Sequence, residues 1–330
     1  MKLMASVLHV RTFGNGKTAA VRWGAAVLVA GSLLTTAQQV GAETAERVRS
    51  PQHFFFGFGA SKPGDLEAMK VRGSNAVMRV QSCLAARGFE ASSLLGFSGA
   101  SVSTNRAPAA LTRAALTKAF ADLRGRLGTN DTIVLYSHTH GVQGRFGREG
   151  GLVLDDPAPS AVLTWTEYAE QLFALPAKTV VVLVMACHSG GLTDYLKTDP
   201  KACSLLQERR EQGRAFLVIT SQNAKALSNP RRIDGEVINP FTYAVQRAFE
   251  GEADGYERGR AAKEPDGRLT LAELTAYAVD EAKRHTRLGD TGNDADPQSA
   301  GAFAPETVLE SFSAARPVPI RQALTQPPAE

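Results

Sequence analysis

Acidic residues are absent from the first 42 positions of this 330-residue chain. The charged side chains of that segment are all basic: Lys2, Arg11, Lys17 and Arg22. Because the whole chain has a formal net charge of +4, taking these four charges away leaves residues 43–330 neutral overall. The isoelectric point near 9.0 therefore comes from the N-terminal segment. We expect no nucleic-acid partner, because such binding depends on excess positive charge over a folded surface.

The N-terminal segment also lacks a hydrophobic run long enough to cross a membrane. Its apolar stretch "GAAVLVAGSLL" (residues 24–34) spans eleven residues, whereas a bilayer requires about 20. The stretch follows basic residues and precedes Val40 and Ala42, which fit the small-residue pattern of a signal-peptide cleavage site. We therefore expect cleavage after Ala42, a secreted or periplasmic protein, and no stable membrane span in the mature chain. An uncleaved N-terminal anchor is the alternative.

Cysteine is scarce, with Cys83, Cys187 and Cys203 only. An odd number excludes a fully paired intrachain disulfide framework, so at least one thiol is free or paired outside the chain. A Cys83–Cys203 bridge would suit an oxidising compartment and would leave Cys187 free. The sequence does not establish the distance that this bridge requires, so the pairing stays open.

Short apolar runs alternate with segments of helical period from about residue 52 onward, which predicts an α/β fold with a mostly parallel sheet. The run 179–186 is apolar at every position except its first, as expected for a strand covered on both faces. The charged segment 197–214 is predicted to be a long loop, and "GLVLDD" (151–156) an arm of a surface hairpin. The expected strands are 53–59, 92–97, 131–141, 179–186 and 215–221, and the expected helices are 65–87, 107–127, 164–175, 240–250 and 270–286.

The sequence also suggests how the chain is divided. We expect a signal peptide over 1–42, a linker over 43–51, one domain over 52–312, and a flexible proline-rich tail over 313–330. No internal repeat is evident.

Reactive side chains follow two of the predicted strands. One strand leads into "SHTHG" (137–141) and the other into "ACHSGG" (186–191). In open α/β sheets, sites lie at the carboxyl ends of the strands. A cysteine nucleophile needs a group that manages protons and backbone N–H groups that stabilise an oxyanion. The glycines favour close backbone approach after the histidine and a tight turn after the cysteine.

The order of an apolar strand, His-Gly, a spacer, a second apolar strand and Ala-Cys resembles the caspase-like clan of cysteine peptidases. This clan includes caspases, metacaspases, legumains and gingipains, and "CHSG" is most similar to the metacaspase version. His140 and Cys187 are 47 positions apart. Weaker similarities in "AARGF" (85–89), "PDGRLTLAEL" (265–274) and "DPQSAG" (296–301) extend the resemblance over roughly residues 52–303.

The resemblance implies a caspase-like three-layer α/β/α sandwich and a cysteine-type endopeptidase acting on a peptide or protein substrate. Cys187 would attack the scissile carbonyl to form a thioacyl-enzyme, and His140 would protonate the leaving amine. The backbone amides of Gly141 and Cys187 would hold the oxyanion. A non-proteolytic interaction or sensing module with the same fold is the alternative, and a peptide ligase is a third option.

One position departs from the family pattern. Two residues before the cysteine, where metacaspases have Asp, legumains Glu and caspases Gln, this chain has Met185. A thioether cannot neutralise a basic side chain at P1, the substrate residue before the scissile bond. We therefore expect a small or apolar P1, unless a loop supplies an acid. Ser221, at the end of the fifth strand, and His188 are further candidate substrate-binding residues.

Metal binding is a competing interpretation of the same motifs. His138, His140, Cys187 and His188 offer zinc ligands, but no carboxylate or second cysteine accompanies them. "AAKEPDGRLTLAE" (261–273) has the spacing of an EF-hand loop without its first carboxylate, so a capped helix start explains it better. We expect no cofactor, although the acidic run 289–297 leaves calcium open.

The Arg209-Arg210 pair falls where relatives of this fold are often cut during activation. A solvated helix or linker is the preferred interpretation of that pair.

Overall fold

The computed structural model describes residues 49–59, 67–95, 110–145, 147–157, 160–258, 263–287 and 296–311. The expected signal peptide, most of the expected linker and the proline-rich tail lie outside these residues. The chain from Ser50 onward forms one compact unit. None of the helices in the described ranges is both long enough and apolar enough to cross a membrane.

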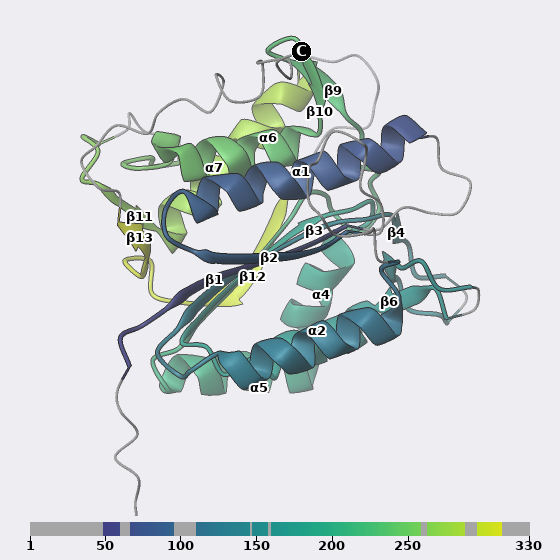
Figure 1. Ribbon diagram of the computed structural model, residues 1–330, viewed down its shortest axis with the longest axis horizontal. Coiled ribbons are helices and arrows are strands. Elements are labelled where there is room, and N and C mark those ends of the chain that lie inside the picture. Colours follow the sequence, from purple (N-terminus) through teal and green to yellow (C-terminus); the bar gives the residue numbers. More distant parts are fainter. Residues whose placement is uncertain are drawn as a thin grey trace, which may run out of the picture. The chain divides into compact units, whose positions relative to one another are not determined.

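A six-stranded sheet forms the centre of this unit (Figure 1). The strands lie in the order β12-β8-β7-β3-β1-β2, and every neighbouring pair is parallel except β12 with β8. The prediction of a mostly parallel sheet is therefore confirmed. The strands are β1 (His53–Gly59), β2 (Glu90–Leu95), β3 (Thr132–His138), β7 (Thr179–Met185), β8 (Ala215–Thr220) and β12 (Gln298–Ala302).

Helices cover both faces of the sheet and give three layers (Figure 1). One face packs against α1 (Glu67–Ala85), α6 (Pro240–Arg247), the π-helical turn Ala248–Glu252 that continues α6, and α7 (Leu271–Arg287). The other face packs against α2 (Arg113–Arg126), α3 (Trp165–Phe173), α4 (Gly190–Thr198) and α5 (Pro200–Glu211). The arrangement is an α/β fold compatible with a three-layer sandwich.

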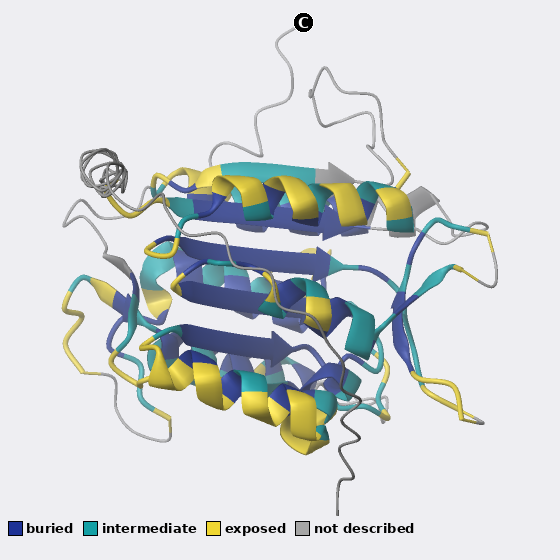
Figure 2. Cartoon of the chain, turned by 90° about the horizontal axis from the view of Figure 1, so that it is seen from below, coloured by how far each residue is buried: buried dark blue, intermediate teal, exposed yellow. Residues whose placement is uncertain are grey.

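Side chains of β7 alternate between the two apolar layers. Val180, Val182 and Val184 join the layer under α2 to α5, whereas Val181 and Leu183 join the layer under α1, α6 and α7. Figure 2 shows the central strands in the colour of buried residues. An uninterrupted apolar run is therefore required here, because both faces of a central parallel strand are removed from water.

Three small antiparallel sheets surround the central one. The arm expected over 151–156 is one strand of the sheet that follows the carboxyl end of β3. The small sheets are β4 (Gly141–Val142) with β5 (Gly151–Val153) and β6 (Val162–Thr164), β9 (Arg231–Ile233) with β10 (Glu236–Ile238), and β11 (Arg268–Thr270) with β13 (Val308–Ser311).

The prediction of a long loop over 197–214 is wrong, because most of this segment is helix α5. Asp199 caps the helix by accepting a hydrogen bond from the Ala202 N–H at 2.9 Å, and Pro200 begins it. Arg209 is buried rather than solvated, and it donates to the carbonyl oxygens of Leu175 and Ala177 at 3.3 and 2.9 Å. Proteolysis at this site would require the helix to unwind.

All three cysteines are free thiols. Cys83 is buried in the layer with α1, α6 and α7, while Cys203 is exposed on α5 on the other side of the sheet. A Cys83–Cys203 bridge is therefore not formed. Burial raises the pKa of the Cys83 thiol to about 12, so this thiol stays protonated at neutral pH.

Helix α3 begins with a capping box. The Thr164 hydroxyl accepts a hydrogen bond from the Glu167 N–H at 3.2 Å, and the Glu167 carboxylate accepts one from the Thr164 N–H at 2.9 Å. Thr166, the second residue of the helix, instead donates its hydroxyl to the Glu149 carboxylate at 3.0 Å. Thr164 is therefore the residue that stabilises the start of α3.

We predict that Thr164→Ala lowers the free energy of unfolding by about 1 kcal/mol, because the Glu167 N–H loses the hydroxyl that accepts its hydrogen bond. Thr166→Ala is the matched control, and its effect should stay within about 0.5 kcal/mol because that hydroxyl is exposed. Urea unfolding of both variants measures the difference. Equal effects would contradict this assignment of the cap.

Candidate active site

The two motifs predicted at strand ends meet in the structure. In the β3–β7 ladder His138 pairs with Met185, so both strands end at the same level of the sheet. Beyond this pair, the Thr139 N–H still donates to the Met185 carbonyl oxygen at 3.2 Å. A Cβ atom placed on Gly141 would overlap the Cys187 carbonyl oxygen. Glycine is therefore required at position 141, because two main-chain segments touch there.

The His140–Gly141 segment is fixed by the small sheet that it begins. The His140 carbonyl oxygen accepts hydrogen bonds from the Val153 N–H at 2.8 Å and from the Thr139 hydroxyl at 2.7 Å. Since His140 and Val153 are hydrogen-bonded partners, the next pair, Gly141 and Leu152, is a non-hydrogen-bonded pair of the antiparallel ladder. The Gly141 N–H consequently points away from β5.

Cys187 lies in the turn between β7 and α4 and is half-buried. His188, the next residue, has a φ of 56°, in the left-handed region that non-glycine residues rarely adopt. Two hydrogen bonds hold it there: its N–H donates to the Ala226 carbonyl oxygen at 2.9 Å, and its Nδ1 lies 3.2 Å from the Ala224 carbonyl oxygen. The strained turn is thus stabilised by the loop that follows β8.

The same loop contacts the sulfur atom. The Ser228 N–H donates to Cys187 Sγ at 3.3 Å, and the Ser228 hydroxyl donates to Met185 Sδ at 3.5 Å. Asn239 Nδ2 donates to the Ser228 hydroxyl at 2.8 Å, while Asn239 Oδ1 accepts from the Phe241 N–H at the start of α6. The side chains that form these hydrogen bonds with Met185 and Ser228 are uncharged.

Ser221 does not face a pocket. It is fully buried, and its hydroxyl bonds the N–H and the carbonyl oxygen of Ala186 at 3.2 and 3.1 Å. It also lies 3.4 Å from the Ser189 hydroxyl. Ser221, predicted from the sequence as a substrate-binding residue, thus joins the end of β8 to the cysteine turn.

Asp296 holds the loop after β8 in place through its contacts with Asn223 and Gln222. Its carboxylate accepts hydrogen bonds from Asn223 Nδ2 at 3.2 Å and forms an ion pair with Lys283 at 3.0 Å, and its N–H donates to Gln222. Burial alone would raise the pKa of Asp296, but the hydrogen bonds from Lys283 and Asn223 outweigh burial and lower it. The carboxylate is therefore ionised at neutral pH.

The four candidate zinc ligands are not brought together. His138 packs against Gly73 of α1, whereas His188 lies on the side of α3 and α4. Within the ranges that the structure describes, no three His, Cys, Asp or Glu side chains are grouped as metal ligands.

The segment compared with an EF-hand begins a capped helix, as predicted. The Glu273 carboxylate accepts hydrogen bonds from the N–H groups of Thr270 at 2.8 Å and Gly255 at 3.0 Å. Most of the acidic run 289–297 lies outside the described residues.

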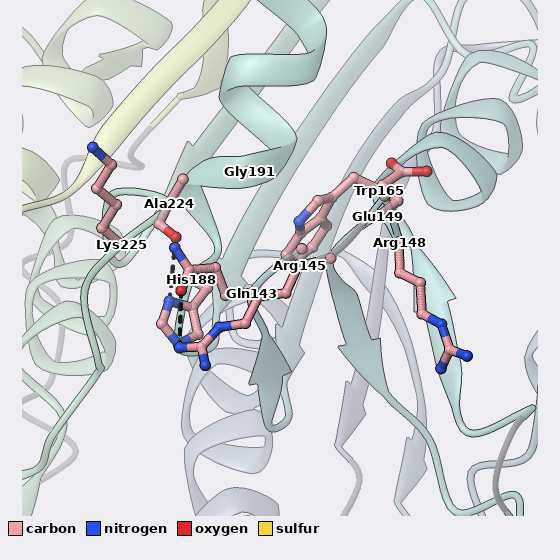
Figure 3. Close-up of a pocket in the computed structure, with 12 residues that line it drawn as sticks. Gln143, Arg145, Arg148, Glu149, Trp165, His188, Gly191, Ala224 and Lys225 are labelled. Atoms are coloured by element: carbon pink, nitrogen blue, oxygen red, sulfur yellow. Dashed lines mark hydrogen bonds between the residues drawn. The ribbon is translucent and has the colours of Figure 1, made fainter.

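A pocket of about 460 Å³ adjoins the cysteine turn (Figure 3). Its walls come from the β4–β5 turn, the start of α3, the turn before α4 and the loop after β8. The lining includes His188, a predicted substrate-binding residue, and further side chains that sequence reasoning missed: Arg145, Arg148, Trp165 and Lys225. The sequence offered no signal for them, because the pocket depends on four separate segments.

We predict that Gly141→Ala lowers the free energy of unfolding by about 1–3 kcal/mol, because the added methyl group would force the Cys187 main chain to move. The matched control is Gly125→Ala in α2, where a Cβ atom meets nothing within 4 Å. That change should raise stability by about 0.5–1 kcal/mol. Urea unfolding measures both values, and a neutral Gly141→Ala variant would contradict the close contact.

Comparison with protein-family models and with curated proteins gives no match. Among solved structures, the chain is similar to the crystal structure of protein GSU0716 from Geobacter sulfurreducens. The TM-score is 0.48 and the sequence identity 18%, over 80% of this chain and 100% of that chain.

Proposed function

We propose that this protein is an exported cysteine endopeptidase of the caspase-like type, with Cys187 and His140 as its catalytic dyad. The observation that carries the proposal is the contact between the Gly141 and Cys187 main chains at the carboxyl edge of a parallel sheet. Structural stability alone does not require a half-buried cysteine in a strained turn beside a His-Gly segment. Export follows from the expected N-terminal signal peptide.

The proposed reaction begins with transfer of the Cys187 thiol proton to His140, followed by attack of the thiolate on the scissile carbonyl carbon of a peptide. A carbon–sulfur bond forms and the carbonyl oxygen becomes an oxyanion, held by the N–H groups of Gly141 and Cys187. The C–N bond then breaks as His140 protonates the leaving amine. Water hydrolyses the resulting thioester, which releases the acid product and regenerates the thiol.

Ser228 sets a condition on this reaction. Its N–H donates to the sulfur and its hydroxyl covers Met185, so it occupies space beside the two residues expected to meet the substrate. A bound peptide has to share or displace these contacts. A non-proteolytic module is the second candidate function, and this coverage of the thiol is the observation that favours it.

We predict that Cys187→Ala abolishes peptide cleavage, by at least about 10³-fold, because the nucleophile is removed. Cys203→Ala is the matched control, since Cys203 is an exposed thiol on α5. Cleavage of a diverse peptide mixture under reducing conditions, with and without calcium, is measured by mass spectrometry. Persistent cleavage by Cys187→Ala would overturn the mechanism, while no cleavage by any folded variant would favour the non-proteolytic module.

The uncharged side chains hydrogen-bonded to Met185 and Ser228 support a small or apolar P1 residue. We predict that Met185→Asp increases cleavage after Arg or Lys relative to cleavage after small apolar residues, because a carboxylate can pair with a basic side chain. Met185→Asn is the matched control, of the same size but without the charge. The ratio of kcat/KM values for the two substrate types measures the change. The same ratio in both variants would refute this role for position 185.

A further inference from the structure

The pocket beside Cys187 lies on the opposite side of the cysteine turn from Met185. Met185 belongs to the apolar layer with α1, α6 and α7, whereas Trp165 belongs to the layer with α2 to α5. His188, directly after Cys187, lines the pocket. In the proposed peptidase, a peptide lying across Cys187 would meet Met185 on one side and this pocket on the other.

Positive charge dominates the pocket. Arg145, Arg148 and Lys225 line it with exposed side chains, and within the described part of the chain none of the three forms an ion pair. Arg145 donates only a long hydrogen bond, at 3.4 Å, to Gln143. Glu149 is the acid among the lining residues, and its Oε1 already accepts hydrogen bonds from the N–H and the hydroxyl of Thr166. Among the residues that the structure describes, the three cations therefore have no acidic partner.

The floor of the pocket combines an aromatic ring with a polar group. Trp165 is 4% exposed, and Gly150 and Gly191 both lie against its indole nitrogen. A Cβ atom on Gly150 would come within 3.1 Å of that nitrogen, and one on Gly191 would overlap it. Side chains at these two positions would fill the space around the indole. Figure 3 shows Arg145 extending toward the side of the pocket where His188 lies.

We propose that this pocket binds a carboxylate of the peptide substrate, with Arg145 as its main partner and Lys225 at the rim. A planar guanidinium binds carboxylates through paired hydrogen bonds. The carboxylate belongs either to an Asp or Glu side chain or to a peptide C-terminus. The identity of the ligand as a peptide rests on the proposed function.

Binding to the full-length Cys187→Ala variant tests this inference without requiring turnover. The probes are short labelled peptide pools with neutral random positions, acetylated and amidated at their ends, that carry either Glu or Gln at one fixed position. A third pool has Gln and a free C-terminal carboxylate. Fluorescence anisotropy should show about fivefold tighter binding for at least one carboxylate-bearing pool than for the amidated Gln pool, and added salt should weaken this preference.

The variant Arg145→Glu/Lys225→Glu should lose that preference and bind a matching Lys pool more tightly. The control Arg210→Glu/Lys178→Glu changes the net charge by the same amount. Both residues are exposed and lie near the amino ends of β8 and β7, whereas the pocket adjoins the turn at the carboxyl end of β7. The control should keep the preference. Equal binding of all three pools, or an unchanged preference in the pocket variant, would overturn the inference.

Tight binding by the Glu pool assigns the carboxylate to a side chain, and tight binding only by the third pool assigns it to a chain end. These outcomes are distinct from those for the proposed function. If no Cys187-dependent cleavage is found, the proposed peptidase function is refuted, but the carboxylate preference can still be measured. If cleavage occurs without a carboxylate preference, only the proposed role of the pocket is refuted.

Discussion

The contact between the main chains of Gly141 and Cys187 is the constraint on which the candidate site depends. Parallel pairing of β3 with β7 brings His138 level with Met185, and the next residues then leave the sheet as two adjoining turns. No side chain intervenes, because residue 141 has none. The histidine and cysteine motifs, distant in sequence, are therefore placed together by sheet register and by one glycine.

A second constraint comes from the loop after β8. Ser221 ties the start of this loop to Ala186, and His188 binds its middle through the carbonyl oxygens of Ala224 and Ala226. Ser228 then reaches the cysteine sulfur, and Asn239 connects Ser228 to the first turn of α6. A positive φ at His188 is sustained by these contacts, because the backbone of a non-glycine residue adopts it only when its surroundings hold it there.

Local signals explain what could be predicted from the sequence. The apolar run of β7 and the Thr164–Glu167 and Thr270–Glu273 capping boxes specify their elements within a few residues. Helix α5 was missed because only Ala202, Leu206 and Arg209 form its buried face, and one of these is charged. Strand β12, "QSAGA", has little strand propensity and forms by pairing with β8. The roles of Ser228 and Arg145 depend on loops that only tertiary contacts fix.

In the proposed peptidase, the two sides of Cys187 would recognise a substrate through different kinds of interaction. The side chains that are hydrogen-bonded to Met185 and Ser228 are neutral, so that side would distinguish substrates by their size and shape. Cations and a buried indole lie on the other side, where the proposed carboxylate would be recognised by its charge. In the proposed peptidase, Met185 stands where metacaspases and legumains have an acid, so that side would not select basic residues. The cationic pocket on the other side of the cysteine turn would select acidic groups instead. Both sides also share the loop after β8, because Ala224 and Lys225 line the pocket and Ser228 contacts Met185, so their contributions to binding should be coupled through that loop.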